Sequence, residues 1–110
     1  MAGELILIVE DNEKNRKLAR DVLQAKGYQT LEAETGEEGV RLAKERRPAL
    51  VLMDIQLPGI DGIAALGQLR ADAATRAIPV IAVTASAMTQ DRQKIMAAGF
   101  DGYQSKPIRP

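Results

Sequence analysis

Hydrophobic residues gather in short runs separated by longer amphipathic stretches. The runs at residues 5–9, 50–53 and 78–83 are almost wholly apolar and contain many β-branched side chains. Continuous runs of this kind are typical of strands that are buried on both faces, as in a parallel sheet. Residues 28–34 alternate between apolar and polar, which suits an edge strand. Residues 103–105 are too short to be assigned from the pattern alone.

Helical spacing follows each of the first four predicted strands. Gly27 is placed to cap the first helix at its C-terminus, and Gly99 stops the fourth. Thr35 and Glu38 form the pattern of a capping box at the start of the second helix. The apolar positions of the four predicted helices are Leu18, Ala19, Val22 and Leu23; Val40 and Ala43; Ile63, Leu66 and Leu69; and Ile95 and Met96.

Strand and helix therefore alternate along the chain, which predicts a single α/β domain over residues 1–110. Such alternation produces a parallel sheet with helices on both faces, joined by right-handed crossovers. Ligands of these sheets bind beyond the carboxyl ends of the strands. The residues just after each apolar run are thus the candidates for chemistry.

Composition excludes several classes of protein. The 110 residues carry 15 basic and 15 acidic side chains, so no net charge draws the chain to nucleic acid or to an anionic membrane. The absence of cysteine and histidine excludes disulfides, thiolate catalysis, a Ser-His-Asp triad and a phosphohistidine carrier. We find no signal peptide and no apolar run near the ~20 residues of a membrane span, so we expect a cytoplasmic protein.

Polar residues stand at the carboxyl end of the predicted strands. Glu10 and Asp11 follow the first run, Asp54 the third, Thr84 the fourth and Lys106 the fifth. Carboxylates ~4 Å apart repel by about 1–4 kcal/mol, so a cation among them is expected. Oxygen ligands without nitrogen or sulfur favour Mg²⁺ or Mn²⁺. Lys106 would then bind an anion that joins the cluster, and a phosphoryl group is the natural candidate.

Each of these residues also has a simpler structural interpretation when taken alone. Acids after strands are often loop residues, Thr84 can end a strand with a satisfied hydroxyl, and Lys106 can be a solvated loop lysine. Their joint occurrence, each at the corresponding end of its own strand, favours a functional site.

Four segments make the chain resemble the receiver domain of two-component response regulators. The match extends over nearly the whole sequence, and the four segments are Leu7–Asn12, Met53–Gly62, Ile78–Ala85 and Gly102–Pro107. The short Glu-Asp-Asn and Asp-Ile-Gln-Leu-Pro motifs look most like those of single-domain regulators and of hybrid-kinase receivers. The resemblance implies a flavodoxin-like, doubly wound sheet of five parallel strands in the order 2-1-3-4-5.

The resemblance also implies a phosphoacceptor. Asp54 would take a phosphoryl group from a phosphohistidine on a partner histidine kinase or histidine phosphotransfer protein. Asp11 and Asp54 would bind Mg²⁺ directly, Glu10 through water and Gln56 through its backbone carbonyl. Lys106 would bind the phosphoryl oxygens. The chain would catalyse only its own phosphorylation and dephosphorylation, so we do not expect a turnover enzyme.

Further residues would form the switch that the resemblance implies. The Thr84 hydroxyl would turn toward the phosphoryl group, and Tyr103 would move inward, which changes the face used for partners. Gln56 and Ser86 occupy positions where the family tunes the lifetime of the phosphoryl group. We expect no contact of this chain with nucleic acid or membrane.

The usual fifth helix of a receiver is absent, because the sequence stops at Pro110. Losing four apolar side chains of such a helix would forfeit about 6–12 kcal/mol of the ~5–15 kcal/mol that stabilise a domain. We therefore expect apolar surface beside the first helix and fifth strand. A longer parent protein is our first explanation; a homodimer that covers this surface, or exchange of C-terminal segments between subunits, is the second.

Three other functions are compatible with parts of the pattern. A flavin carrier shares the architecture, but Glu10 and Asp11 stand where it needs a phosphate cradle. An aspartate-nucleophile phosphatase usually has a second carboxylate two residues after the nucleophile, where Gln56 stands. A degenerate receiver that acts only as a docking or dimerisation module would not need Asp11, Asp54, Thr84 and Lys106.

Overall fold

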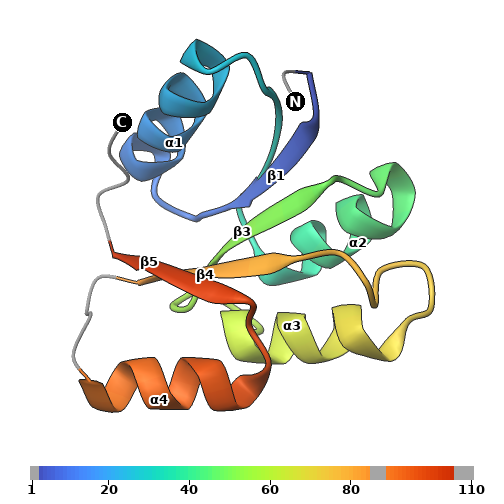
Figure 1. Cartoon of the computed structure of the whole chain (residues 1–110), viewed down its shortest axis with the longest axis vertical. Coiled ribbons are helices and arrows are strands. Elements are labelled where there is room, and N and C mark those ends of the chain that lie inside the picture. The colour runs from blue at the N-terminus through green and yellow to red at the C-terminus, as the bar shows by residue number, and fades with distance from the viewer. Residues whose placement is uncertain (1–2, 85–88, 106–110) are drawn as a thin grey trace.

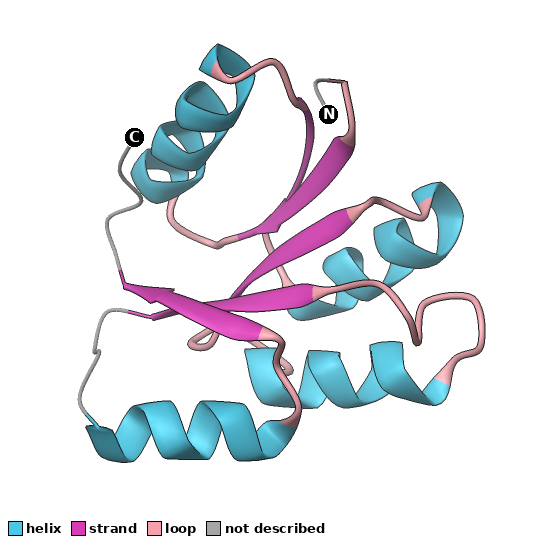
Figure 2. Cartoon of the chain, viewed as in Figure 1, coloured by secondary structure: helices cyan, strands magenta, loops and turns pink. Residues whose placement is uncertain are grey.

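A computed structural model describes residues 3–84 and 89–105 of the chain, and within them strands and helices alternate (Figure 2). The strands form one parallel sheet in the order β2-β1-β3-β4-β5, which confirms the predicted fold. The elements in chain order are β1 (Leu5–Val9), α1 (Glu13–Ala25), β2 (Gln29–Ala33), α2 (Gly36–Arg46), β3 (Leu50–Asp54), α3 (Gly62–Ala71), β4 (Val80–Thr84), α4 (Thr89–Ala98) and β5 (Gly102–Ser105).

The main core lies on one face of the sheet, under α2, α3 and α4, while α1 packs on the other face (Figure 1). Alternation along the strands explains this division. Leu7 and Val9 of β1 belong to the main core, whereas their neighbours Ile6 and Ile8 are buried outside it. A parallel sheet covered on both faces needs such continuous apolar strands.

The ends of α1 and α2 follow the predicted capping signals, with one difference. Gly27 has a φ of +91°; its N–H donates to the Gln24 carbonyl and that of Tyr28 to the Leu23 carbonyl, which is a Schellman motif. Thr35 accepts a hydrogen bond from the Glu38 N–H at 3.1 Å, as a capping box requires. The Glu38 carboxylate, however, accepts from the backbone N–H of Glu34, one residue before the position that a capping box uses.

The fourth strand begins later than its apolar run, at Val80 rather than at Ile78. Pro79 has no N–H to give to a neighbouring strand, and only its carbonyl joins the sheet, by accepting from Val51. The Val80 N–H donates instead to the Asp101 carboxylate at 2.7 Å, and Arg70 binds the same oxygen at 2.7 Å. This contact fixes the entry into β5, a strand that the sequence pattern alone does not assign.

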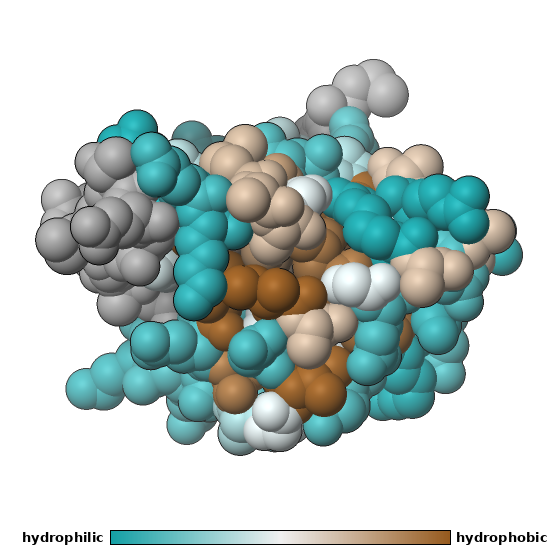
Figure 3. All heavy atoms as spheres, turned by 90° about the horizontal axis from the view of Figure 1, so that it is seen from below, coloured by the Kyte–Doolittle hydropathy of each residue, from teal (hydrophilic) through white to brown (hydrophobic). Residues whose placement is uncertain are grey.

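Some apolar side chains remain partly exposed on both faces. Leu52 and Ile81, on the α1 side of the sheet, are half-buried, and Leu18 on α1 is 44% exposed. Figure 3 views the molecule from the side of α3 and α4 and shows apolar side chains gathered among polar ones. Among the described residues, no helix has the length and apolar character that crossing a membrane requires.

Candidate functional site

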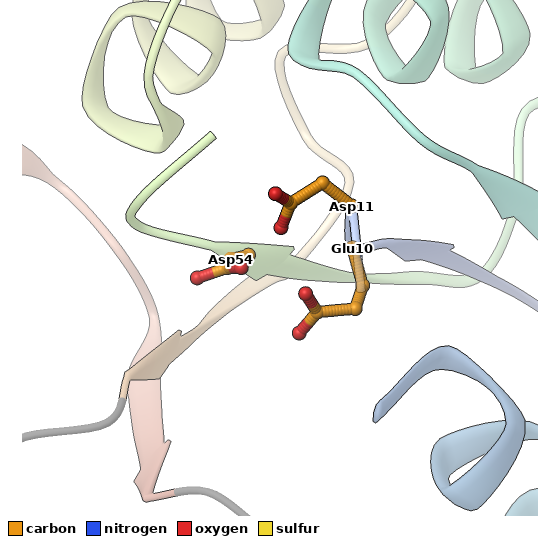
Figure 4. Close-up of side chains that lie close together, drawn as sticks. All are labelled: Glu10, Asp11 and Asp54. Atoms are coloured by element: carbon orange, nitrogen blue, oxygen red, sulfur yellow. The ribbon is translucent and has the colours of Figure 1, made fainter. Parts of the chain in front are cut away.

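Three carboxylates meet at the carboxyl edge of the sheet. Glu10 and Asp11 directly follow β1, and Asp54 is the last residue of β3. These ends lie side by side because Val9 pairs with Met53 in the parallel register. One oxygen from each carboxylate lies within 4.8 Å of the others, and the three side chains gather in one place (Figure 4). The sequence prediction that these acids come together is confirmed.

The buried members of this acid cluster are held by backbone N–H groups. Glu10 is only 4% exposed and accepts a hydrogen bond from the Asn12 N–H at 3.0 Å. Asp54 is 2% exposed, and its Oδ1 accepts from the Gln56 N–H at 3.1 Å. Asp11 is exposed. These N–H donors fix the orientation of the two buried carboxylates.

The loop between β3 and α3 depends on glycine at two points. Gly59 has a φ of +74°, a conformation that other residues rarely adopt. Gly62 lies so close to the end of β3 that a Cβ there would sit 2.2 Å from the Asp54 carbonyl oxygen. Asp61 caps α3 by accepting from the Ala64 N–H at 2.8 Å. The start of α3 is thereby packed directly against the backbone of Asp54.

A pocket of about 730 Å³ opens above the acid cluster. It gives Asp54 access to a ligand although this side chain is almost fully buried. Its lining includes residues that the sequence analysis did not identify as part of a site: Asn12, Asn15, Asp61 and Lys94. Asn12 and Asp61 precede helices as N-cap residues do, which is a readable signal. Nothing in the sequence indicates Lys94, because only the packing of α4 brings it to the pocket.

The donor set suits a divalent cation. At a separation of 4.8 Å, each pair of charged carboxylates repels by about 1–3.5 kcal/mol for effective dielectrics between 80 and 20. A bound dication would turn this repulsion into attraction. The three residues offer only hard oxygen ligands, the chemistry that Mg²⁺ prefers. Glu10, Asp11 and Asp54 are therefore the residues that could hold a metal ion here.

Of the remaining predicted site residues, the structure describes Thr84 and Tyr103. Thr84 is 9% exposed and ends β4, one position beyond Val83, which pairs with Asp54. Tyr103 is half-buried in β5, and the Arg92 guanidinium lies 5.1 Å from the centre of its ring. Ser86 and Lys106 lie outside the described residues.

Comparison with known proteins identifies the family of this chain. The model of the response regulator receiver domain family matches residues 6–110. The polar-differentiation response regulator DivK of Brucella anthropi is 50% identical over 103 residues, which are 94% of this chain and 84% of that protein.

Solved structures agree in fold. The receiver domain of the sensor histidine kinase PA1611 from Pseudomonas aeruginosa PAO1, with magnesium coordinated in its active-site cleft, is 38% identical with a TM-score of 0.89. That match covers 98% of this chain and 88% of the other. A receiver domain of a histidine kinase from Syntrophus aciditrophicus is 33% identical with a TM-score of 0.86, over 97% and 81% of the two chains. This chain belongs to the response regulator receiver domain family.

Proposed function

We propose that this receiver accepts a phosphoryl group on Asp54, with Mg²⁺ held by Glu10, Asp11 and Asp54. The observation that carries the proposal is the gathering of one buried aspartate and two further acids at the floor of an open pocket. A magnesium ion in the cleft of the related Pseudomonas receiver supports the choice of metal. When bound, the ion would neutralise negative charge that the acids and the phosphoryl oxygens bring together.

The chemistry is a displacement at phosphorus. An oxygen of the Asp54 carboxylate forms a bond to phosphorus while the P–N bond to the donor imidazole breaks, and the bonding electrons leave with the ring nitrogen. The donor histidine belongs to a histidine kinase or histidine phosphotransfer protein, because this chain has no histidine. The Gln56 N–H holds Asp54 Oδ1 in place and so orients the nucleophile.

The residues around Asp54 would respond to the negative charge that the phosphoryl group adds. We assign Lys106 to the phosphoryl oxygens and the backbone carbonyl of Gln56 to the metal. Thr84 ends the neighbouring strand and is suited to turn its hydroxyl toward the added group, which carries about −1.5 to −2 charge. Tyr103 would then move inward, and Gln56 and Ser86 would set the lifetime of the acylphosphate. Such a change is a two-state equilibrium biased by one covalent group.

The direct test is acylphosphate formation. Incubation with acetyl phosphate and Mg²⁺ should add about 80 Da, the mass of one phosphoryl group. Asp54→Asn should abolish the gain. Asp61→Asn is the matched control, because Asp61 lines the same pocket but serves as a helix cap, a role that asparagine fills equally well. A mass gain that persists in Asp54→Asn would refute the assignment of the acceptor.

A further inference from the structure

The Arg16 guanidinium connects three segments of the chain beside the acid cluster. Its Nη1 donates to the backbone carbonyl of Glu10 at 3.0 Å. Its Nε donates to the Glu32 carboxylate on β2 at 3.2 Å, and its Nη2 lies 3.4 Å from the Glu34 carboxylate after β2. The Arg16 side chain is 13% exposed and that of Glu32 29%, so their contact is partly shielded from water, whereas Glu34 is 70% exposed.

The carbonyl that Arg16 binds belongs to a metal-site residue. Around it, the Glu10 N–H donates to the Ala33 carbonyl at 3.0 Å, and the Glu10 carboxylate accepts from Asn12. Glu10 is thus fixed at its N–H by β2, at its side chain by the following turn and at its carbonyl by Arg16. That carbonyl belongs to the peptide unit that continues into Asp11, so its direction governs where the Asp11 carboxylate lies.

We propose that Arg16 is a positioning residue of the metal site. By binding the Glu10 carbonyl while it is anchored on Glu32 and Glu34, it sets the placement of the Glu10 and Asp11 carboxylates relative to Asp54. The inference rests on the proposed function, since it concerns the same Mg²⁺ site. Partners that orient metal ligands in this way commonly change metal affinity about 10- to 100-fold when they are removed.

Arg20 provides a matched control one helical turn further on. Its Nη1 binds the same Glu32 carboxylate at 3.2 Å, and its hydrogen bonds in the structure are to Glu32 alone among the described residues. Removing either arginine deletes one positive charge, its contact to Glu32 on β2 and one further ion pair, to Glu34 for Arg16 and to Asp21 for Arg20. Only the removal of Arg16 also releases the Glu10 carbonyl.

The direction in which Mg²⁺ affinity changes distinguishes a positioning role of Arg16 from a purely electrostatic one. Deleting a cation near three carboxylates makes the site more negative, so a purely electrostatic role predicts tighter Mg²⁺ binding. A positioning role predicts weaker binding, because the ligands lose their arrangement. Lysine restores the charge but cannot bridge the carbonyl and both carboxylates with one planar fork.

The experiment measures Mg²⁺ binding to the full chain by isothermal titration calorimetry. The variants are Arg16→Met, Arg16→Lys and Arg20→Met, each checked by thermal melting. We expect Arg16→Met to weaken binding about tenfold and Arg16→Lys at least about threefold, with Arg20→Met within about twofold of the original chain. Phosphorylation by acetyl phosphate should need more Mg²⁺ in the Arg16 variants but reach nearly the original rate at saturation.

The outcomes are distinct. Unchanged or tighter Mg²⁺ binding in both folded Arg16 variants overturns the positioning role. Equal weakening in Arg20→Met also overturns it, because the loss would then follow from the ion pairs to β2. If the original chain binds no Mg²⁺, the proposed metal site itself fails and the role of Arg16 fails with it. If Arg16→Met does not fold, Arg16→Lys still decides the matter.

Discussion

Replacing Gly62 by alanine should displace the backbone of Asp54, the proposed phosphoacceptor, and so disturb the site. An alanine Cβ would lie 2.2 Å from the Asp54 carbonyl oxygen and 2.9 Å from the Ile55 Cα, far inside the ~3.5 Å of an ordinary contact. Both are backbone atoms, so neither can swing aside as a flexible side chain could. The hydrogen bond from the Gly62 N–H to the Ile55 carbonyl, 3.0 Å long, must also stretch.

The expected cost follows from these two terms. Overpacking of this kind costs about 1–3 kcal/mol, and the strained hydrogen bond about 0.5–1.5 kcal/mol. At about 4 °C per kcal/mol for a domain near this size, the melting temperature should fall by at least about 6 °C. Because the displaced atoms carry the acceptor side chain, the rate of phosphorylation by acetyl phosphate should fall about tenfold or more.

Gly67→Ala is the matched control for Gly62→Ala. Gly67 lies in the same helix and is exposed, and no atom lies within 4 Å of the place that an added methyl group would take. Alanine is the better helix former by about 1 kcal/mol, so this variant should melt a few degrees higher and phosphorylate normally. If Gly62→Ala melts as Gly67→Ala does, or is phosphorylated at the original rate, the close approach of α3 does not position Asp54.

Two further predictions concern ions and protons. Mg²⁺ at ten times its dissociation constant should stabilise the fold by about 1.4 kcal/mol, and thermal melts of Asp11→Asn should show a smaller rise; an equal rise would place the ion elsewhere. The Ala74 N–H lowers the pKa of Asp72 below its ordinary value of 3.8; burial opposes this shift, and Lys44 and Arg47 add smaller effects that lower the pKa further. The stability that Asp72 contributes is therefore present above its unfolded pKa and is lost as pH falls through its lower folded pKa. The chemical shift of the Asp72 carboxyl carbon, followed by NMR as pH is lowered, would give the folded pKa. A folded pKa at or above 3.8 would contradict this prediction.

Much of the site could be predicted because parallel sheets collect the carboxyl ends of their strands at one edge. That rule alone brings Glu10, Asp11 and Asp54 together, since each follows or ends a strand that the apolar runs reveal. The helix ends were equally readable, because Gly27 and Thr35 form local motifs within a few residues. Both kinds of signal lie in short stretches of sequence.

Features that depend on distant packing were not predictable. Arg16 meets Glu32 across sixteen residues, and Lys94 lines the pocket only because of where α4 lies in the fold. The Val80 N–H at the start of β4 likewise donates to the carboxylate of Asp101, which lies twenty-one residues away. In each case an ordinary charged residue acquires its role from a partner that no local pattern indicates.

Within the described residues, the acid cluster is a place where the chain departs from what folding alone would favour. Strands and caps agree with the fold at every level, whereas Glu10 and Asp54 put two nearly buried carboxylates side by side. The surrounding structure stabilises this arrangement. The Asn12 and Gln56 N–H groups donate hydrogen bonds to the Glu10 and Asp54 carboxylates. Gly62 permits the close packing behind Asp54. Because repulsion among the acids opposes folding and a dication reverses it, the same placement that lowers stability creates affinity for the metal. A chain selected for stability alone would have no reason to keep that conflict, and this is why the cluster points to function.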